Sequence, residues 1–482
     1  MKRSLYDINP TRTSHDVGQK RVLLAADESG CSLTQIAVTD LKAGETAVAH
    51  IHPDMQEGFY VLSGELEVTL DGETQLCRPD DFIYVDSGTA HEMKALTDVR
   101  IMTIGCVIEA MREKLYPMLF EPNLHEVVWG GQKILNWKQR GSYSDTAANQ
   151  PASSADEGTA EGLIGESWEV SAVPSSSSIV ANGTWAGYNL PDVIARRPRE
   201  ILGKAVAARY GSQLPLLAKF IDADKDLSIQ VHPDDEMARR EHGKLGKSEM
   251  WYVIDAKPGA YLYAGFSEEL TPEQYKQRVA DGTITESLAR HEVHPGDVFY
   301  LPAGRVHAIC SGILLAEIQQ SSDVTYRIYD YGRPGMDGKP RELHTELAAQ
   351  ALDFEVQGDY RTTYEHNSSP AGENAKGSVA ECLDTTHFSV RIVDASATTH
   401  RDLIKYDSFI ILMCTRGQCT IRIRATGTEV PLSEGNSCLI PAAIANYDII
   451  PSGEVRLLEA YIDNRPKTFI RTLVNGFRHL RF

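Results

Sequence analysis

The amino-acid sequence predicts a mainly β protein made of three antiparallel jelly-roll β-barrel modules, with helical insertions in the central module. The first observation is length, because 482 residues exceed the ~100–200 residues of a typical single domain. The second is a repeated unit in which two strands join through a turn that contains glycine: FYVLSGELEVTL, MWYVIDAKPGAYLYAGF and FIILMCTRGQCTIRI. Each copy is followed by a further β-like segment that ends in a proline or a turn: DDFIYVDSGTAH, GDVFYLPAGRVH and GNSCLIPAAIAN.

Strand and helix signals follow one another in a consistent order. Before residue 110, short β-like runs are separated by turns, and a DG pair between two alternating segments predicts a hairpin. The central part adds strands at LSIQVHP, EMWYVIDA, DVFYLPAG and ILLAEIQ, and helices are expected at 190–209, 233–242, 271–290 and 342–352. After residue 376 the β pattern returns in HFSVRIVDA and VRLLEAYI.

Two stretches of small polar residues, 143–162 and 366–376, are expected to be exposed loops or linkers. A softer boundary falls near 111–117, where the strand-rich region ends. We therefore expect three domains, at residues 1–112, 113–365 and 366–482.

Composition excludes several classes of function. Because 48 basic and 67 acidic residues leave a net charge of −19, the chain repels phosphate backbones and anionic lipid, so nucleic-acid and membrane partners are not expected. No apolar run approaches the ~20 residues of a bilayer span, and the first residues do not resemble a secretory signal. The eight scattered cysteines then indicate reduced thiols in a cytoplasmic protein.

A first group of candidate metal ligands lies near the N-terminus. His50 and His52 point the same way on a strand because side chains alternate between faces. Glu57 follows on the next strand, and His91 lies on a returning strand. Three imidazoles and one carboxylate inside a barrel predict a site for a divalent transition metal such as Zn, Mn, Fe or Ni. The alternative is that the strand histidines face solvent and His91 caps a loop.

This spacing, together with the repeat, resembles the cupin family: HxH, then glutamate after four residues, then GxxH. Asp86 departs from the family, which usually has proline before that glycine. Such a module could be an enzyme, a sugar-binding sensor or a structural site, and the sequence does not choose between them.

The central region holds a second group of candidate ligands. In LSIQVHP, Ser228, Gln230 and His232 alternate onto one face of a strand. Glu249 begins the next strand and His307 ends a later one. Gln230, His232, Glu249 and His307 could therefore close around one ion with O, N, O and N donors, a mixed set that zinc accepts.

Six separated strings in this region resemble type I mannose-6-phosphate isomerases, particularly the short bacterial form: WGG (129–131), IGESWEVS (164–171), SIQVHPDD, the KxE of GKSEMW, LPAGRVHA and TYRIYDYGR. The resemblance implies Zn²⁺ on Gln230, His232, Glu249 and His307. It also implies catalytic roles for Arg327 and Lys247, and substrate contacts by Ser228 and Lys219. The substrate would be a sugar phosphate, with mannose 6-phosphate and fructose 6-phosphate interconverted through a cis-enediol.

Several alternatives stay open. Some family members carry a histidine directly before the KxE motif, where this chain has Gly246, so the catalytic base is unassigned. The C-terminal module lacks HxH and GxxH and is expected to be a degenerate, metal-free cupin. The competing functions are a non-catalytic sugar-phosphate-binding cupin protein, or an N-terminal oxygenase or epimerase with the rest as scaffold. The chain is expected to be a monomer or a homodimer.

Overall fold

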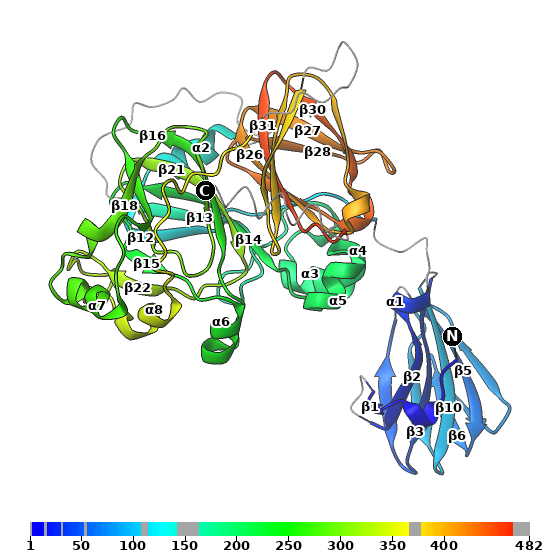
Figure 1. Cartoon of the computed structure of the whole chain (residues 1–482). Coiled ribbons are helices and arrows are strands. Elements are labelled where there is room, and N and C mark those ends of the chain that lie inside the picture. The colour runs from blue at the N-terminus through cyan, green and yellow to red at the C-terminus, as the bar shows by residue number, and fades with distance from the viewer. Residues whose placement is uncertain are drawn as a thin grey trace. The chain divides into compact units, whose positions relative to one another are not determined.

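The computed structural model describes residues 2–13, 17–29, 32–52, 55–107, 114–141, 163–365 and 377–465. It divides into two compact units, Met1–Lys114 and Leu115–Phe482, each described by itself (Figure 1). Within the described residues the strands form six sheets, and helices are few and short. The mainly β fold class is therefore confirmed. The expected linkers at 143–162 and 366–376 lie wholly outside the described residues.

The first unit is a barrel of two antiparallel sheets. One sheet has the order β1 (Thr11–Arg12), β2 (Gln19–Ala25), β3 (Leu33–Leu41), β10 (Val99–Val107), β5 (Met55–Ser63) and β8 (Phe82–Val85). The other has the order β4 (Thr46–His50), β9 (His91–Ala95), β6 (Leu66–Leu70) and β7 (Glu73–Cys77). A 3-10 turn at Leu5–Asp7 and the short α1 (Ala26–Ser29) complete the unit. Its apolar core is built from residues of both sheets, with Val61, Leu66 and Ala95 fully buried.

The hairpin predicted from the DG pair is present between β6 and β7. Asp71 and Gly72 have φ values of 46° and 88°, and Leu70 pairs with Glu73 across the turn. Two successive residues with positive φ match the right-handed twist of a two-residue hairpin, which is why glycine and aspartate are favoured there.

The central barrel of the second unit pairs a six-stranded sheet with a five-stranded one. The larger sheet has the order β12 (Leu124–Gly131), β13 (Ile164–Val170), β14 (Leu216–Ala223), β21 (Ile313–Gln320), β16 (Glu249–Ala256) and β19 (Val298–Leu301). The smaller has the order β18 (Leu288–Glu292), β17 (Tyr261–Phe266), β20 (His307–Ile309), β15 (Ile229–Val231) and β22 (Tyr326–Tyr329). Strands β14 and β21 are buried along their whole length because the sheet is covered on both faces.

The helices agree with the expected ranges in part. The expected helix at 190–209 is three short helices: α3 (Leu190–Arg196), α4 (Pro198–Ile201) and α5 (Lys204–Tyr210). Pro198 and Gly203 separate them, because proline cannot continue a preceding helix and Gly203 has φ +101°. Helices α6 (Asp235–His242) and α8 (Thr345–Ala351) lie inside their expected ranges, and α2 (Lys133–Gly141) was not expected.

The expected helix at 271–290 is wrong in its second half. Helix α7 (Pro272–Ala280) ends at a turn in which Gly282 has φ +72°, and the chain then continues into a 3-10 turn and β18. A capping box at Thr271 fixes the start of α7. The amphipathic pattern beyond residue 281 therefore belongs to a half-exposed strand rather than to a helix.

The C-terminal barrel also has two sheets. One has the order β11 (Met118–Leu119), β29 (Ser437–Ile440), β26 (Ile410–Arg416), β31 (Val455–Tyr461), β24 (Ser389–Ala395) and β23 (Gly377–Asp384). The other has the order β25 (Thr399–Asp402), β30 (Asn446–Pro451), β27 (Gln418–Ile423) and β28 (Glu429–Ser433). Strand β11 comes from the beginning of the second unit, so the start of the central region completes the C-terminal sheet.

One continuous hydrophobic core joins the two barrels of the second unit. It contains Trp137 and Phe220 of the central region together with Phe409 and Leu458 of the C-terminal barrel. The Arg456 guanidinium also donates to the Tyr252 hydroxyl across this junction. The domain boundaries expected at 112 and at 365 border segments that are not described, so the three-domain division stays a prediction.

The interior of the C-terminal barrel contains a buried ion pair. Arg401 donates to both oxygens of Glu459, at 2.9 and 2.5 Å, and the Tyr447 hydroxyl donates to the same carboxylate at 2.7 Å. Burial raises the pKa of Glu459, but Arg401 outweighs it and holds that pKa below its usual value. Among the described residues, both candidate metal clusters lie in the other two barrels. No helix in the described part of the chain is long and apolar enough to cross a membrane.

The Glu459→Ala substitution should destabilise the second unit by about 3–5 kcal/mol, because it leaves the Arg401 charge buried without its partner. Urea unfolding followed by tryptophan fluorescence measures this change. Glu454→Ala, which removes the exposed partner of Arg416, is the control and should change the unfolding midpoint little. Equal shifts for the two variants would contradict the structural role of the buried pair.

Candidate functional site

A row of three polar side chains crosses the smaller sheet of the central barrel. His307 on β20 pairs with Gln230 on β15, and Gln230 pairs with Arg327 on β22. Directly opposed residues of antiparallel strands share one face of the sheet. Ser228 precedes Gln230 by two residues and therefore lies on the same face. The strand register brings together residues that are up to 99 positions apart in the sequence.

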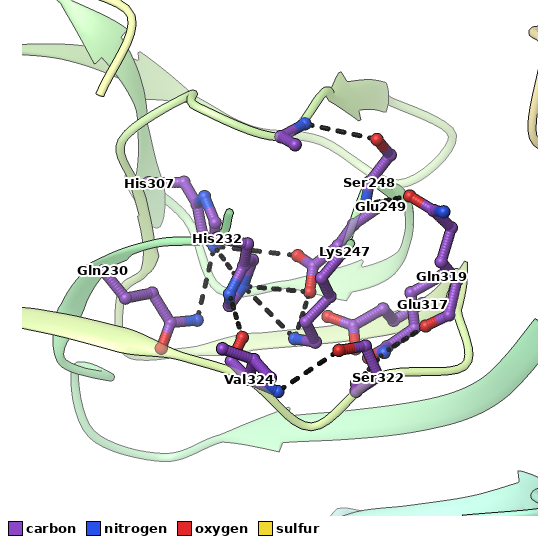
Figure 2. Close-up of polar contacts among 12 residues, drawn as sticks. Gln230, His232, Lys247, Ser248, Glu249, His307, Glu317, Gln319, Ser322 and Val324 are labelled. Atoms are coloured by element: carbon purple, nitrogen blue, oxygen red, sulfur yellow. Dashed lines mark hydrogen bonds and ion pairs between the residues drawn. The ribbon is translucent and has the colours of Figure 1, made fainter. Parts of the chain in front are cut away.

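Two histidines of this site turn one ring nitrogen toward a common centre. The Nε2 atoms of His232 and His307 lie 3.2 Å apart (Figure 2). Their Nδ1 atoms lie 2.9 Å from the Val324 carbonyl and 2.8 Å from the Arg305 carbonyl. A protonated Nδ1 that donates to a carbonyl leaves Nε2 with a free lone pair, which is the arrangement of metal-binding histidines.

Glu249 brings a carboxylate to the same centre. Its Oε1 lies 3.2 Å from His232 Nε2, and its Oε2 lies 3.6 Å from His307 Nε2. The Lys247 ammonium lies 2.5 Å from Oε1, and both side chains are buried. Burial raises the pKa of Glu249, but Lys247 outweighs it and holds that pKa well below its usual value. Burial, with the charge of Lys247, lowers the pKa of His232 to about 3. The site therefore combines neutral imidazoles with an ionised carboxylate.

These residues fit a divalent metal. His232, Glu249 and His307 can each offer one ligand atom, all within 4.8 Å of one another. Glu249 Oε2 is buried and has no hydrogen-bond partner in the described structure. The Gln230 amide nitrogen lies 3.3 Å from His307 Nε2, so a half-turn of that amide directs its oxygen to the centre. Two imidazoles with oxygen donors are a donor set that zinc accepts.

A cationic region adjoins the predicted ligands. Arg327 Nε lies 3.3 Å from Ser228 Oγ, which brings the two predicted substrate residues together. Asp330 accepts hydrogen bonds from Arg333 and Arg341 a few residues further along the same segment. Burial, and then the charge of Arg341, lowers the pKa of Arg327. The region therefore has three guanidinium groups and one buried carboxylate, a composition suited to an anion.

Lys219 belongs to a buried array of charges on the larger sheet. Its ammonium lies 3.5 Å from Glu317 and 3.7 Å from Glu166, over the ring of Trp168. Burial lowers the pKa of Lys219, but Glu166 and Glu317 outweigh it and raise that pKa. The substrate contact expected of Lys219 stays a prediction.

Glu317 was missed by the sequence analysis. It lies on β21 opposite both Lys219 and Trp251, whose indole donates to Oε2 at 2.9 Å. Its Oε1 is buried without a hydrogen-bond partner among the described residues. Burial, and then the charge of Glu249, raises the pKa of Glu317. The sequence signal was a glutamate inside the apolar run ILLAEIQ. Ionisable residues are rarely buried in a strand unless they are paired, so such a residue indicates a charged partner or a functional role.

Gly246 cannot be replaced by a histidine in this fold. A Cβ atom there would lie 2.6 Å from the backbone of both Asp234 and Asp235. The Gly246 amide also donates to the Asp235 carboxylate at 2.8 Å. The chain therefore excludes a side chain directly before the Lys247–Glu249 motif.

The N-terminal barrel contains a similar cluster of histidines around a glutamate. His50, His52, Glu57 and His91 each offer a ligand atom within 4.8 Å of the others. His50 Nδ1 lies 2.8 Å from the Val48 carbonyl, and His91 Nδ1 lies 3.2 Å from the Thr89 carbonyl. Glu57 Oε2 lies 3.4 Å from His52 Nε2 and 3.5 Å from His91 Nε2. His91 Nε2 is buried and lacks a hydrogen-bond partner in the described residues, so this cluster also fits a metal.

The chain matches two family models. Residues 37–106 match the cupin domain, and residues 120–261 match the catalytic domain of type I phosphomannose isomerase. These matches cover the N-terminal candidate ligands and much of the central site.

Curated relatives and solved structures agree with these matches. The chain is 42% identical over 238 residues to the probable mannose-6-phosphate isomerase GmuF of Bacillus subtilis, covering 49% of this chain and 68% of that protein. It is 31% identical to mannose-6-phosphate isomerase ManA of Bacillus subtilis, covering 69% of this chain and 95% of that protein. The crystal structure of the mannose 6-phosphate isomerase from Bacillus subtilis matches with a TM-score of 0.61 at 30% identity, over 72% of this chain and 99% of that one. The membership expected from the six motifs is thereby confirmed, and the chain belongs to the type I mannose-6-phosphate isomerases, a family of enzymes with the cupin fold.

Proposed function

We propose that this chain is a zinc-dependent aldose-ketose isomerase that interconverts mannose 6-phosphate and fructose 6-phosphate. The observation that supports it is the convergence of Gln230, His232, Glu249 and His307 on one centre next to Ser228 and Arg327. The relatives named as mannose-6-phosphate isomerases support the choice of substrate.

The reaction moves a proton between C2 and C1 of the sugar through a cis-enediol. Zinc held by Gln230, His232, Glu249 and His307 would supply a Lewis acid for the negative charge that develops on the sugar oxygens. Lys247 adds a second positive charge beside that position. Ser228 and Arg327 would hold the phosphate, since they lie 3.3 Å apart, which gives Arg327 a binding role in place of the catalytic role that the resemblance implied. This remote binding energy positions C1 and C2 without taking part in the proton transfer.

We propose Glu317 as the group that moves the proton. It is a buried carboxyl with one oxygen free of hydrogen bonds within the described structure, and its raised pKa brings it closer to the operating pH, where general bases are efficient. Lys219 would keep the charge of Glu166 and Glu317 balanced while the proton moves.

We also propose that His50, His52, Glu57 and His91 hold a divalent transition metal that is separate from the isomerase site. The support is the second set of converging imidazole nitrogens around a carboxylate. Residues 366–482 would form a metal-free barrel whose task is to stabilise the central one, since both share a hydrophobic core.

The His232→Ala variant should lose the central zinc and isomerase turnover together, because an imidazole ligand is removed. His50→Ala should lose metal from the N-terminal barrel and keep turnover with mannose 6-phosphate. Metal analysis by mass spectrometry and a coupled isomerase assay measure both quantities. If His50→Ala abolished turnover and His232→Ala did not, the assignment of the two barrels would be reversed.

The Glu317→Gln variant should lower kcat about 10²–10⁴-fold, as expected for removal of a proton-transfer group. Its zinc content and KM should change little because the amide is nearly isosteric. Exchange of the sugar C2 hydrogen with deuterated water should slow in parallel. Glu166→Gln, which removes the other carboxylate beside Lys219, is the matched control, and equal losses in both variants would exclude a specific role for Glu317.

The Arg327→Ala variant should raise KM for mannose 6-phosphate about 10- to 100-fold, because hydrogen bonds to charged groups contribute ~1.5–3 kcal/mol. Its kcat/KM for mannose without phosphate should stay near the parent value. Arg290→Ala removes an exposed guanidinium that stacks on Tyr261 and should change neither substrate. Equal losses with mannose and mannose 6-phosphate would place Arg327 at the reacting carbons instead of at the phosphate.

A further inference from the structure

The N-terminal barrel contains a cavity of about 170 Å³ that isomerisation does not use. One end is formed by the candidate metal ligands His50, His52, Glu57 and His91. The other end contains the polar side chains of Lys20 and Gln35. The rest of the wall is largely apolar, with Leu41, Ala47, Met55, Phe59, Met93 and Ile101, and also carries the hydroxyls of Thr13, Thr39 and Thr103.

Strand register fixes the separation of the two ends. Gln35 on β3 pairs with Gly105 on β10, and Gly105 pairs with Glu57 on β5. Because neighbouring strands are ~4.8 Å apart, Gln35 and Glu57 are separated by about 10 Å across the sheet. A Cβ atom at Gly105, which lies between them on β10, would meet Thr34 Oγ1 at 2.3 Å, so the chain has room only for glycine at this position.

Lys20 places a positive charge at the end opposite the metal ligands. It pairs across the sheet with the buried Thr39, which also lines the cavity. Its ammonium lies 3.3 Å from the Gln35 side-chain oxygen. No carboxylate of the described residues lies within ion-pair distance of Lys20, whereas Arg21 on the same strand is paired with Asp40. A cation at the edge of a largely apolar cavity, with no counterion among the described residues, favours an anionic ligand group.

The wall is poorly suited to a sugar phosphate of the kind proposed for the central site. The hydroxyls of Thr13, Thr39 and Thr103 line the cavity, but several hydroxyl groups of a hexose would still face Leu41, Phe59 and Ile101, and unpaired buried hydroxyls are unfavourable. The volume is also below the ~300 Å³ at which pockets for drug-sized ligands begin. The ligand must therefore be short, with a hydrocarbon middle.

We propose that the N-terminal barrel binds a short aliphatic dicarboxylate. One carboxylate completes the coordination of the metal held by His50, His52, Glu57 and His91, and the other accepts hydrogen bonds from Lys20. The methylene groups between them pack against Met55 and Phe59, which flank Glu57 on β5. This inference rests on a metal at the N-terminal cluster, and it is independent of the isomerase reaction in the central barrel.

The test uses the full chain carrying His232→Ala and His307→Ala, loaded with Co²⁺, so that cobalt occupies the N-terminal cluster alone. Glutarate and pentanoate are the probes, because they share the chain length and differ in the second carboxylate. Cobalt absorption in the visible range reports ligation, and calorimetry reports affinity. Glutarate should bind at least about tenfold more tightly than pentanoate, since a charge-assisted contact is added.

Lys20→Met should remove the preference for glutarate and leave pentanoate binding unchanged. Lys94→Met, at an exposed position on β9, is the matched control and should keep the preference. Circular dichroism checks that the variants are folded. The proposal is overturned if cobalt does not bind, if the two probes bind equally, or if Lys20→Met retains the preference. An isomerase assay of the unmodified chain decides the proposed function separately, so the two failures can be distinguished.

Discussion

The sites of this protein depend on one repeated interaction, the hydrogen bond between the Nδ1 atom of a barrel histidine and a backbone carbonyl. It occurs at His232 and His307 in the central barrel and at His50 and His91 in the N-terminal barrel. Because the carbonyl belongs to the backbone, the direction of each ring is set by the fold rather than by a mobile side chain. The Nε2 atom on the opposite side of the ring is then held toward a carboxylate. The ligand atoms are therefore preorganised for a metal ion.

The three barrels differ in the side chains that fill their interiors. The central barrel surrounds its ligands with ionisable groups, among them Lys219, Lys247 and Glu317, which suits a reaction in which charge develops. The N-terminal barrel surrounds its ligands with apolar side chains and one lysine, which suits recognition of a small anion. The C-terminal barrel fills its interior with the Arg401–Glu459 pair, whose charges satisfy each other. Under the functions proposed for the three barrels, one fold would serve chemistry, binding and stability through the residues that face inward.

Much of this arrangement could be predicted because it depends on local patterns. The alternation of His50 with His52, and of Ser228 with Gln230, follows from strand geometry alone. The hairpin at Asp71–Gly72 follows from residues that tolerate positive φ. The helix expected beyond residue 281 was wrong because a mixed polar and apolar segment is compatible with both periodicities, and strand pairing with β17 decided the outcome. Glu317 was missed because its role depends on neighbours from β14 and β16, which are distant in the sequence.

The sequence by itself determined the β class, the repeated unit and the identities of the candidate ligands, since each depends on residue type and short-range spacing. Only the tertiary structure decided which of these side chains meet, because the row from His307 through Gln230 to Arg327 exists only through the pairing of β20, β15 and β22. It also decided that neither Gly246 nor Gly105 has room for a side chain, since the atoms that a Cβ would meet there come from other segments. Pairing between strands that are distant in the sequence brings the separate motifs together into one site, and no local sequence pattern encodes this pairing.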